Sequence, residues 1–538
     1  MVSLGLLVLS GCGGGTTITL CTGCTSQGPP ISTTTTMTAA PQEATVGNPV
    51  TFTANVSPAT NGVVEFFDAM EDNYIDQVLL YSGVATGSVT ALGVGTHVLT
   101  ATFTLDGQYQ ASTSSPGVVV TVSAAGANCG LGTATYTLTS GTATQSGASY
   151  SATANNQSAV CAANSGTSLT LNNPSISNSG YSGQYGDVSN DDISGIGAAV
   201  LAYGPSTSSA SGASVTITGG SITTASIGTD DLFASGLGSS ISATGTTLST
   251  TYFGVTNGSG ARLSYNHAAA AARGGSVTLN NVSASNTEYS GALFSVDGDG
   301  SAIIVNGGSF VSNAYSSTAR IEGNGSLTLN NATVTGSPEY GVEFTSSATD
   351  GSSPGAGSLT MTGGSFALSS ASGLGSSILV SDGAEAAVSL TGTNLIPAAP
   401  VPGITPIFLA AGTGFGGTTG AVVTLNANGV TIPGVLQYGY ASTLNVSLLN
   451  TTGWNGWFEV SSPQPGAANL TMDASSTWSV SAPCHVETFS DPGGISGLNV
   501  VNVTGNGYTV TYNPAKNPTL GGLTYNLSGG GSLTPGAE

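Results

Sequence analysis

The sequence predicts an all-β chain in which a small N-terminal β-sandwich is followed by a right-handed parallel β-helix, or solenoid. Two observations carry this prediction. A short phrase, Ser-Leu-Thr-Leu-Asn-Asn or a close variant, keeps returning along the middle of the chain. The 538 residues also include 80 Gly, with 39% hydrophobic and only 6% charged residues. This composition suits strands stacked in narrow coils, because disordered chains combine few apolar residues with high charge.

The repeated phrase has the properties of one strand of a solenoid coil. Apolar and hydroxyl residues alternate, which places them on opposite faces of a strand, and an Asn-Asn or Gly-Gly pair then provides a sharp corner. Such a strand needs the next coil to cover its apolar side. We therefore expect β-helix repeats over residues 166–450; a series of β-sandwiches is the alternative, but it explains the recurring phrase less well. Clear copies begin at Ser168, Ser214, Ser276, Ser326 and Ser358, and looser copies at Ser240, Ser301, Ala387 and Val422.

Residues 1–12 are predicted to be a signal peptide. The apolar run from Leu4 to Leu9 is too short to span a bilayer and is typical of a signal sequence. The ending Leu-Ser-Gly-Cys at residues 9–12 resembles a bacterial lipobox, which implies that Cys12 is acylated and anchors the chain. A cleaved signal peptide with an incidental Cys12 is the alternative. No Lys or Arg precedes the run, so a start upstream of Met1 is left open.

Residues 13–32 are rich in Gly, Thr, Ser and Pro and are predicted to be a flexible linker. Cys21 and Cys24 form a Cys-x-x-Cys pair within it. Since no second pair stands at metal-binding spacing, we expect a local disulfide or no role at all for these two residues.

Residues 33–123 are predicted to form a small β-sandwich. Two of its strands, Gly62–Asp68 and Gly95–Ala101, resemble the "GxVxFxD" and "GTHxLTA" strands of bacterial Ig-like domains. The resemblance implies a stalk or spacer, and sometimes a sugar-binding module. His97 lies inside the second phrase, and we expect it to be structural. The predicted strands are Val50–Ala54, Val63–Phe67, Gly95–Phe103 and Val118–Val122.

Residues 124–165 are expected to form the N-terminal cap region of the β-helix. They contain Cys129 and Cys161, which can form a disulfide outside the cytoplasm. Cys484 would then be left over, so the pairing of the cysteines stays open.

Residues 451–538 are predicted to form the terminal β-helix coils and a C-terminal cap. Within them, residues 469–480 end on a Trp-containing strand and resemble the terminal coils of pertactin-type autotransporter passenger domains. The resemblance implies the architecture more than an activity. Unlike that family, the chain shows no following stretch of lipid-facing strands long enough for an outer-membrane barrel, so attachment is expected through Cys12.

The charge of the chain restricts its partners. Only 4 Lys and Arg stand against 26 Asp and Glu, which gives a formal net charge of −22. Nucleic-acid binding depends on basic residues that neutralise phosphates, so it is not expected, and neither is docking on an anionic membrane. We expect a monomer without a cofactor, secreted or anchored at the bacterial cell envelope by its lipid alone. Its expected partner is a carbohydrate or the surface of a host or neighbouring cell.

Two acidic pairs, Asp191-Asp192 and Asp230-Asp231, are the candidate catalytic residues. Inverting glycosidases hold two carboxylates ~6.5–9.5 Å apart, and stacked coils rise ~4.8 Å each, so acids two coils apart could reach that distance. However, the repeats contain only three basic residues and lack the Gly-His-Gly and Arg-x-Lys phrases of polygalacturonases. We therefore predict a non-enzymatic, adhesin-like or structural protein; a polysaccharide-binding or polysaccharide-degrading, pectin lyase-like protein is the alternative.

Three further patterns have simpler explanations. Asp297 and Asp299 flank Gly298 as in a calcium loop, but the remaining oxygen ligands are missing, so a tight turn is expected. His267 precedes a run of five Ala and is placed in a loop with a short helix. The Thr-x-Thr phrases raise ice binding, which needs a flat and evenly spaced Thr ladder; the uneven spacing of the phrases argues against it.

Overall fold

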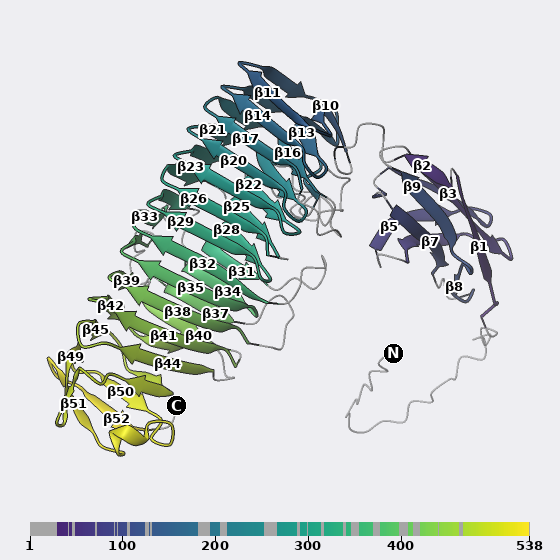
Figure 1. The fold of residues 1–538 in the computed structure, drawn as a ribbon. Coiled ribbons are helices and arrows are strands. Elements are labelled where there is room, and N and C mark those ends of the chain that lie inside the picture. Colours follow the sequence, from purple (N-terminus) through teal and green to yellow (C-terminus); the bar gives the residue numbers. More distant parts are fainter. Residues whose placement is uncertain are drawn as a thin grey trace, which may run out of the picture. The chain divides into compact units, whose positions relative to one another are not determined.

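A computed structural model describes residues 30–536, apart from short gaps (Figure 1). The chain forms two compact units, an N-terminal one that ends at Thr121 and a C-terminal one that runs on from Val122. Each unit is described by itself. The gaps are residues 41, 46–48, 70–72, 91, 94, 105–107, 124–128, 130–131, 181–193, 205–211, 227, 252–265, 288–290, 299, 314–316, 337–339, 346–354, 370–376, 398–406, 413–419, 440 and 462–465.

The N-terminal unit is a β-sandwich of two sheets. Phe52 and Phe66, one from each sheet, are both fully buried, and their ring centroids lie 4.4 Å apart. His97 Nδ1 and Asp68 Oδ2 form a buried hydrogen bond of 2.5 Å, so His97 has a structural partner. One sheet has the order β1 (Thr34–Ala40), β3 (Val50–Ser57), β6 (Val84–Val89). The other has the order β2 (Glu43–Thr45), β9 (Val118–Ser123), β7 (Gly95–Phe103), β4 (Gly62–Asp68), β5 (Asn73–Leu80), with β8 (Ser112–Thr113) paired to β7.

The C-terminal unit is a parallel β-helix, whose coils stack from β10 and β11 at one end to β52 at the other (Figure 1). Three strands from each coil join three parallel sheets. The first sheet contains β10 (Thr133–Leu138), β13 (Gln157–Ala163), β16 (Val200–Tyr203), β19 (Leu232–Ser235), β22 (His267–Ala272), β25 (Ala292–Asp297), β28 (Ser317–Glu322), β31 (Tyr340–Thr345), β34 (Ser377–Asp382), β37 (Ile407–Gly412), β40 (Val435–Tyr438) and β43 (Phe458–Val460).

The second sheet is built by the repeated phrase. It contains β11 (Thr142–Ser146), β14 (Ser168–Asn172), β17 (Ser214–Thr218), β20 (Ser240–Thr244), β23 (Ser276–Asn280), β26 (Ala302–Asn306), β29 (Ser326–Asn330), β32 (Ala356–Thr362), β35 (Glu385–Thr391), β38 (Val422–Asn428), β41 (Thr443–Leu449), β44 (Ala467–Met472) and β47 (Thr488–Ser490).

The third sheet follows each phrase after its corner. It contains β12 (Ser149–Ala152), β15 (Ser175–Asn178), β18 (Ser221–Thr224), β21 (Thr247–Thr250), β24 (Ser283–Asn286), β27 (Ser309–Ser312), β30 (Thr333–Gly336), β33 (Ser365–Leu368) and β36 (Asn394–Ile396).

A fourth sheet closes the C-terminal end. Its order is β39 (Thr431–Pro433), β42 (Gly453–Gly456), β45 (Thr477–Val480), β49 (Asn499–Thr504), β51 (Tyr525–Ser528), β52 (Ser532–Pro535), β50 (Thr509–Tyr512), β46 (Cys484–Val486), and β48 (Ile495–Ser496) pairs with β49. A short 3-10 helix spans Pro518–Leu520 between these strands. The all-β prediction, with an Ig-like sandwich and a long parallel β-helix, is confirmed.

Register explains how the phrase builds a core. The strands of the second sheet from β14 to β32 pair in continuous register, so that Leu329 on β29 lies between Val305 and Met361 of the neighbouring coils. All three side chains are at most 4% exposed. The same inward column continues through Leu171, Ile217, Ala243 and Leu279.

The corner between the second and third sheets is two residues long in most coils, and its first residue has a positive φ. Asn331 has φ 51° and Gly363, the equivalent residue of the next coil, has φ 62°. The left-handed region is accessible to Gly and comparatively well tolerated by Asn, which explains the Asn or Gly at this place in the phrase. The Asn331 N–H donates to Thr362 O of the next coil (2.8 Å), so the backbone N–H at the corner also has a hydrogen-bond partner.

The expected short helix after His267 is wrong, because residues 267–272 form strand β22. All six residues are buried. Ala270 pairs with Phe233 of the preceding coil, on the outward side of the first sheet. A strand buried on both faces beside a phenylalanine needs small side chains, and this packing outweighs the helix propensity of Ala.

The terminal coils are packed by aromatic residues. Trp454 and Trp478 lie opposite each other on β42 and β45, and their rings stack in parallel at 4.8 Å. Each indole N–H donates to a backbone carbonyl, of Gly434 (2.9 Å) and Gly456 (3.1 Å) respectively. An antiparallel pair of β51 and β52 ends the described chain.

Candidate functional site

One extended surface feature of the solenoid is the outward face of the second sheet. Because alternate residues point outward, the phrases contribute three outward columns, which consist of hydroxyl and amide side chains except at Ala302 and Ile304 of β26. Within β14 to β32 these outward columns contain no charged residue. The central column runs Thr170, Thr216, Ser242, Thr278, Ile304, Thr328 and Thr360.

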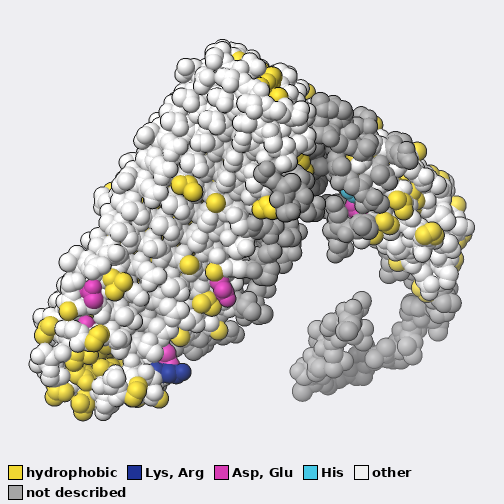
Figure 2. Space-filling model, viewed as in Figure 1, with side chains coloured by type: hydrophobic (Ala, Val, Ile, Leu, Met, Phe, Trp, Pro, Cys, Tyr) yellow, Lys and Arg dark blue, Asp and Glu magenta, His cyan; other side chains and the backbone are white. Residues whose placement is uncertain are grey.

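The last outward column contains an amide ladder over three successive coils, between Thr244 on one side and Thr362 on the other. Asn306 Nδ2 donates to Asn280 Oδ1, and Asn330 Nδ2 donates to Asn306 Oδ1, each at 2.9 Å. These bonds fix the side chains relative to one another along the sheet. The face shown in Figure 2 agrees with this description, since most of the solenoid there is neither charged nor hydrophobic. We call the outward face of β14 to β32 the neutral face.

The neutral face is evenly stacked, although the phrases are unevenly spaced in the sequence. Neighbouring strands of a sheet lie ~4.8 Å apart whatever the length of chain between them. The extra residues lie elsewhere, mainly between the third strand of one coil and the first strand of the next, as in residues 179–199 and 251–266. The uneven spacing is therefore no argument against a regular Thr ladder, and the reason given above for excluding ice contact is wrong.

The acidic pair Asp230-Asp231 lies in the interior of the solenoid. Asp231 is 0% exposed and accepts hydrogen bonds from the hydroxyls of Thr224 (3.0 Å) and Thr250 (3.2 Å) in two successive coils. Burial raises the pKa of Asp231 well above its usual value, an effect that the two hydroxyls only partly offset. A carboxyl group enclosed in this way contacts its own coils and has no access to a polymer on the surface.

Asp230 is equally enclosed and is paired with His267. Its Oδ1 accepts hydrogen bonds from the backbone N–H of His267 (2.7 Å) and from His267 Nδ1 (2.9 Å). Burial raises the pKa of Asp230, and His267 offsets this in part. The placement of both acids favours a structural role. Asp191 and Asp192 lie outside the described residues.

A second group of acidic residues, of which the sequence analysis singled out only Asp297, lies on the outward side of the first sheet. In the strand register, Asp297 lies beside Glu322 of the next coil, and Arg320 of that coil lies beside Glu343 of the following one. Arg320 forms an ion pair with Glu322, and the hydroxyl of Ser317 donates to Glu343. Asp297 and Glu322 are only 8% and 5% exposed. These carboxylates therefore contact neighbouring side chains of the sheet and do not line an open cleft.

The Asp297-Gly298-Asp299 segment, for which a tight turn is expected rather than a calcium loop, follows the first sheet. Asp297 ends β25, and the Ser301 N–H donates to Gly298 O (2.8 Å) in a tight turn. Asp299 lies outside the described residues. Nowhere in the described part of the chain do three or more His, Cys, Asp or Glu side chains come together as metal ligands.

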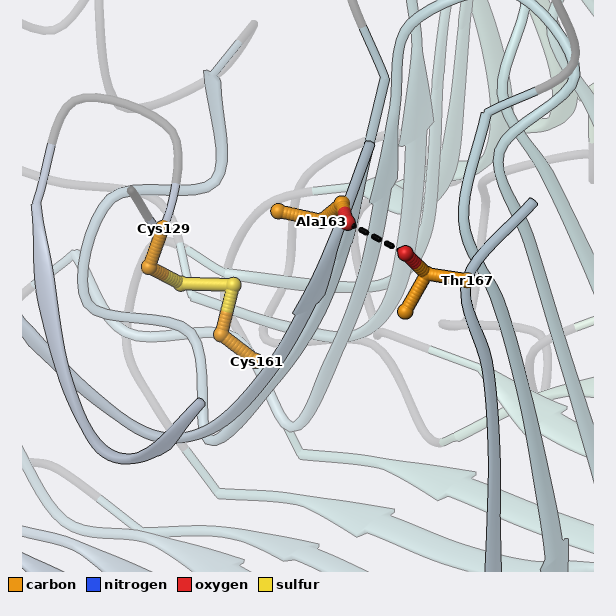
Figure 3. Close-up of a disulfide and its surroundings, with 4 residues drawn as sticks. All are labelled: Cys129, Cys161, Ala163 and Thr167. Carbon is orange, nitrogen blue, oxygen red and sulfur yellow. Dashed lines mark hydrogen bonds between the residues drawn. A yellow bond between two sulfur atoms is a disulfide. The ribbon is translucent and has the colours of Figure 1, made fainter. Parts of the chain in front are cut away.

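A disulfide joins Cys129 to Cys161 of β13, across 32 residues of sequence (Figure 3). Both residues belong to a buried cluster on the outward side of the first sheet, together with Leu201 and Phe233. Beside it, the hydroxyl of Thr167 donates to Ala163 O (2.7 Å). The disulfide thus ties the chain that precedes β10 to the second coil. Cys12, Cys21 and Cys24 lie outside the described residues.

Among the cysteines that the structure describes, Cys484 has no disulfide partner, and its thiol is shielded from solvent. Burial raises its pKa to about 12, which disfavours the thiolate needed for nucleophilic chemistry. The neighbouring His485 bonds to the hydroxyl of Thr511 (2.9 Å). The two residues therefore do not form a Cys–His catalytic pair.

Residues 37–123 match the family model of the bacterial Ig-like domain (group 3). No significant match was found among curated proteins or among solved structures. In the part of the chain that the structure describes, no helix has the length and apolar character needed to cross a membrane. The N-terminal sandwich is a bacterial Ig-like domain, and its combination with a parallel β-helix fits a surface or structural protein of a bacterium.

Proposed function

We propose that this protein is a non-enzymatic, adhesin-like solenoid of the bacterial cell surface, anchored through an acylated Cys12, and that its neutral face binds a neutral carbohydrate. The observation that carries the proposal is the neutral face itself. It offers many hydroxyl and amide groups in fixed register and no charge, which matches a polymer that repeats hydroxyl groups and carries no charge.

The surroundings of the acidic residues in the solenoid favour carbohydrate binding over catalytic turnover. The described acidic groups of the solenoid's first half are buried and hydrogen-bonded, as shown for Asp230, Asp231 and Glu322. A hydrolase needs a general acid and a base or nucleophile that reach the glycosidic bond. Turnover of a polysaccharide that disappears in Asp191→Asn or Asp230→Asn would favour the alternative, a pectin lyase-like enzyme.

Two pairs of substitutions test the proposal. Thr278→Lys with Thr328→Lys places two charges on the neutral face, while Ser285→Lys with Thr335→Lys places two charges on the outward side of the third sheet. All four positions are half-buried strand residues, so the two variants are matched for stability. Retention on insoluble neutral polysaccharides is the measurement.

We expect the unaltered protein and the third-sheet variant to be retained, and the neutral-face variant to lose at least tenfold in affinity. Retention should persist in 0.5 M NaCl, because salt screens charge pairs and no charge pair is involved. Equal losses in both variants would show that the neutral face is not the contact. Adsorption to ice crystals without adsorption to any neutral polysaccharide would replace the carbohydrate by ice, the other regular hydroxyl-bearing surface.

A further inference from the structure

A buried carboxyl group in the C-terminal cap has one oxygen without a hydrogen-bond partner. Asp491 follows β47 and is 1% exposed. Its Oδ1 accepts a hydrogen bond from the Gly494 N–H (2.9 Å), whereas its Oδ2 is buried and receives none. A buried acceptor without a donor is costly, so its surroundings need an explanation.

The nearest partner of this oxygen is another unsatisfied acceptor. Asn502 on β49 donates through Nδ2 to Asp473 O (3.3 Å) and Ser476 O (3.1 Å), and its buried Oδ1 receives no hydrogen bond. A Cβ atom built on Gly494 would lie 2.0 Å from Asn502 Oδ1 and 2.1 Å from Asp491 Oδ2. Both oxygens therefore point at the same place, and they are at most about 4.1 Å apart, the sum of these two distances.

Rotating the Asn502 amide by half a turn does not resolve the conflict. Its oxygen would then face the carbonyls of Asp473 and Ser476, which are acceptors as well. A metal ion is a poor answer, since calcium takes six to eight oxygens and only two converge here. The remaining species that satisfies both oxygens is a hydrogen atom on the carboxyl group.

We propose that Asp491 is protonated in the closed cap and donates its hydroxyl hydrogen to Asn502 Oδ1, which makes this contact a pH-sensitive latch. The latch joins three segments. Asn502 holds the turn at residues 473–476 through its amide hydrogens, and Asp491 holds the turn at residues 491–494 through Gly494. The two turns also touch, because a Cβ on Gly493 would lie 2.5 Å from Ala474 Cβ.

The surroundings of Asp491 also favour its protonated form. Burial raises the pKa of Asp491, and the negative charge of Asp473 raises it further, while the hydrogen bond from the Gly494 N–H lowers it. Asp473 itself accepts hydrogen bonds from Asn450, Ser475 and Ser476, which lower its pKa to about 2, so it stays ionised. Strands β48 and β49 contribute no titratable side chain.

The sign of the pH effect follows from linkage. In an open cap Asp491 loses its proton above its ordinary pKa of 3.8, whereas in the closed cap it keeps the proton to a higher pH. The stability contributed by the latch is complete below 3.8 and falls as the pH rises toward the closed-state pKa. The cap is therefore tightest in acid and loosens toward neutral pH.

Asp491→Asn tests the latch in the full-length protein. The new amide can donate to Asn502 Oδ1 while its oxygen accepts the Gly494 N–H, so it copies the protonated carboxyl at every pH. Hydrogen exchange of the Val501 N–H, which donates to Gly494 O (2.9 Å), reports opening of the cap between pH 4 and 8, after correction for intrinsic exchange. Amides of β23 serve as the internal control for changes outside the cap.

In the wild type we expect the opening constant at Val501 to rise, by up to tenfold per pH unit, until it levels off at the closed-state pKa. In Asp491→Asn it should stay flat and match the wild type at pH 4, whereas Asp491→Ala should be open at every pH. A flat wild-type profile, or an Asp491→Asn profile that still rises with pH, would overturn the proposal. Protection that increases with added calcium in the wild type but is lost in Asp491→Asn would replace the proton by a metal ion.

Discussion

At the scale of single residues, the position of a side chain along its strand decides whether it belongs to the core. Leu329 and Thr328 are neighbours in β29, yet Leu329 is 4% exposed between Val305 and Met361 of adjacent coils, and Thr328 faces outward. The alternation in the phrase was enough to predict this, because successive side chains of a strand point to opposite faces.

Leu329→Ala is therefore expected to destabilise the solenoid by ~2–5 kcal/mol, because it leaves a cavity between coils that the rigid stack cannot close. Thr328→Ala should change the stability by no more than about 0.5 kcal/mol, as outward substitutions usually do. Denaturant unfolding of the full-length variants, followed through the solenoid transition, measures both. Equal losses would mean that the inward face is wrongly assigned.

Buried polar residues could not be predicted in the same way. Asp230 and Asp231 stand out in the sequence as an acidic pair, but nothing local tells that Thr224 and Thr250 from two coils enclose Asp231. Asp491 carried no signal at all, since its partner Asn502 comes from another strand. Such contacts depend on which residues the coiling brings together, and this is a property of the whole fold.

At the scale of elements, the corners between the second and third sheets are matched from coil to coil. The pair Asn331-Ala332 is followed in the next coil by Gly363-Gly364, and a Cβ on Gly363 would lie 2.3 Å from Asn331 Oδ1. The Asn side chain occupies the space that the following Gly leaves free. The same order recurs where Gly219 lies against Asn173 and where Gly307 lies against Asn281.

Two glycines with similar backbone φ angles allow a test of how closely the corners of adjacent coils pack. Gly364 has φ 63° and Gly392 has φ 57°, so alanine is strained at both, by about 1–2 kcal/mol. A Cβ on Gly364 would also lie 2.2 Å from Ala332 O, whereas a Cβ on Gly392 meets nothing within 4 Å. We expect Gly364→Ala to lower the thermal unfolding midpoint of the solenoid clearly more than Gly392→Ala. Similar midpoints for the two variants would show that the contact between corners is not limiting.

The repeated phrase predicts the strands of the second and third sheets but not those of the first sheet. Strands of the first sheet, such as β19 and β22, are buried on both sides, so they lack the alternation that identifies a half-buried strand. The copy that begins at Val422 shows a second limit. The structure pairs Ala387 with Thr424, two residues later than the phrase suggests, and a shift of two preserves which side chains face inward.

At the scale of the whole molecule, the uneven repeat length and the regular face are compatible because insertions and ladders occupy different parts of each coil. The two-residue corner after the phrase is nearly constant, while chain is added mainly where third strands lead to first strands and, in some coils, between the first and second strands. The solenoid can thus vary in sequence length from coil to coil without disturbing the neutral face. The sequence alone could not separate these effects, since it shows only the total length of a repeat.

Attachment to the cell is the remaining prediction for the whole molecule, and it concerns Cys12, which lies outside the described residues. If the lipobox-like ending at residues 9–12 is processed, Cys12 becomes acylated, and the Ig-like domain then stands between the anchor and the solenoid in the order of the chain. Expressed in a Gram-negative host with a competent start, the protein should incorporate labelled palmitate and sediment with membranes. Cys12→Ser should abolish both, while Cys21→Ser, a cysteine substitution in the adjoining linker, should leave both unchanged. Release of the unlabelled wild-type protein into the medium would refute the anchor and leave a secreted solenoid.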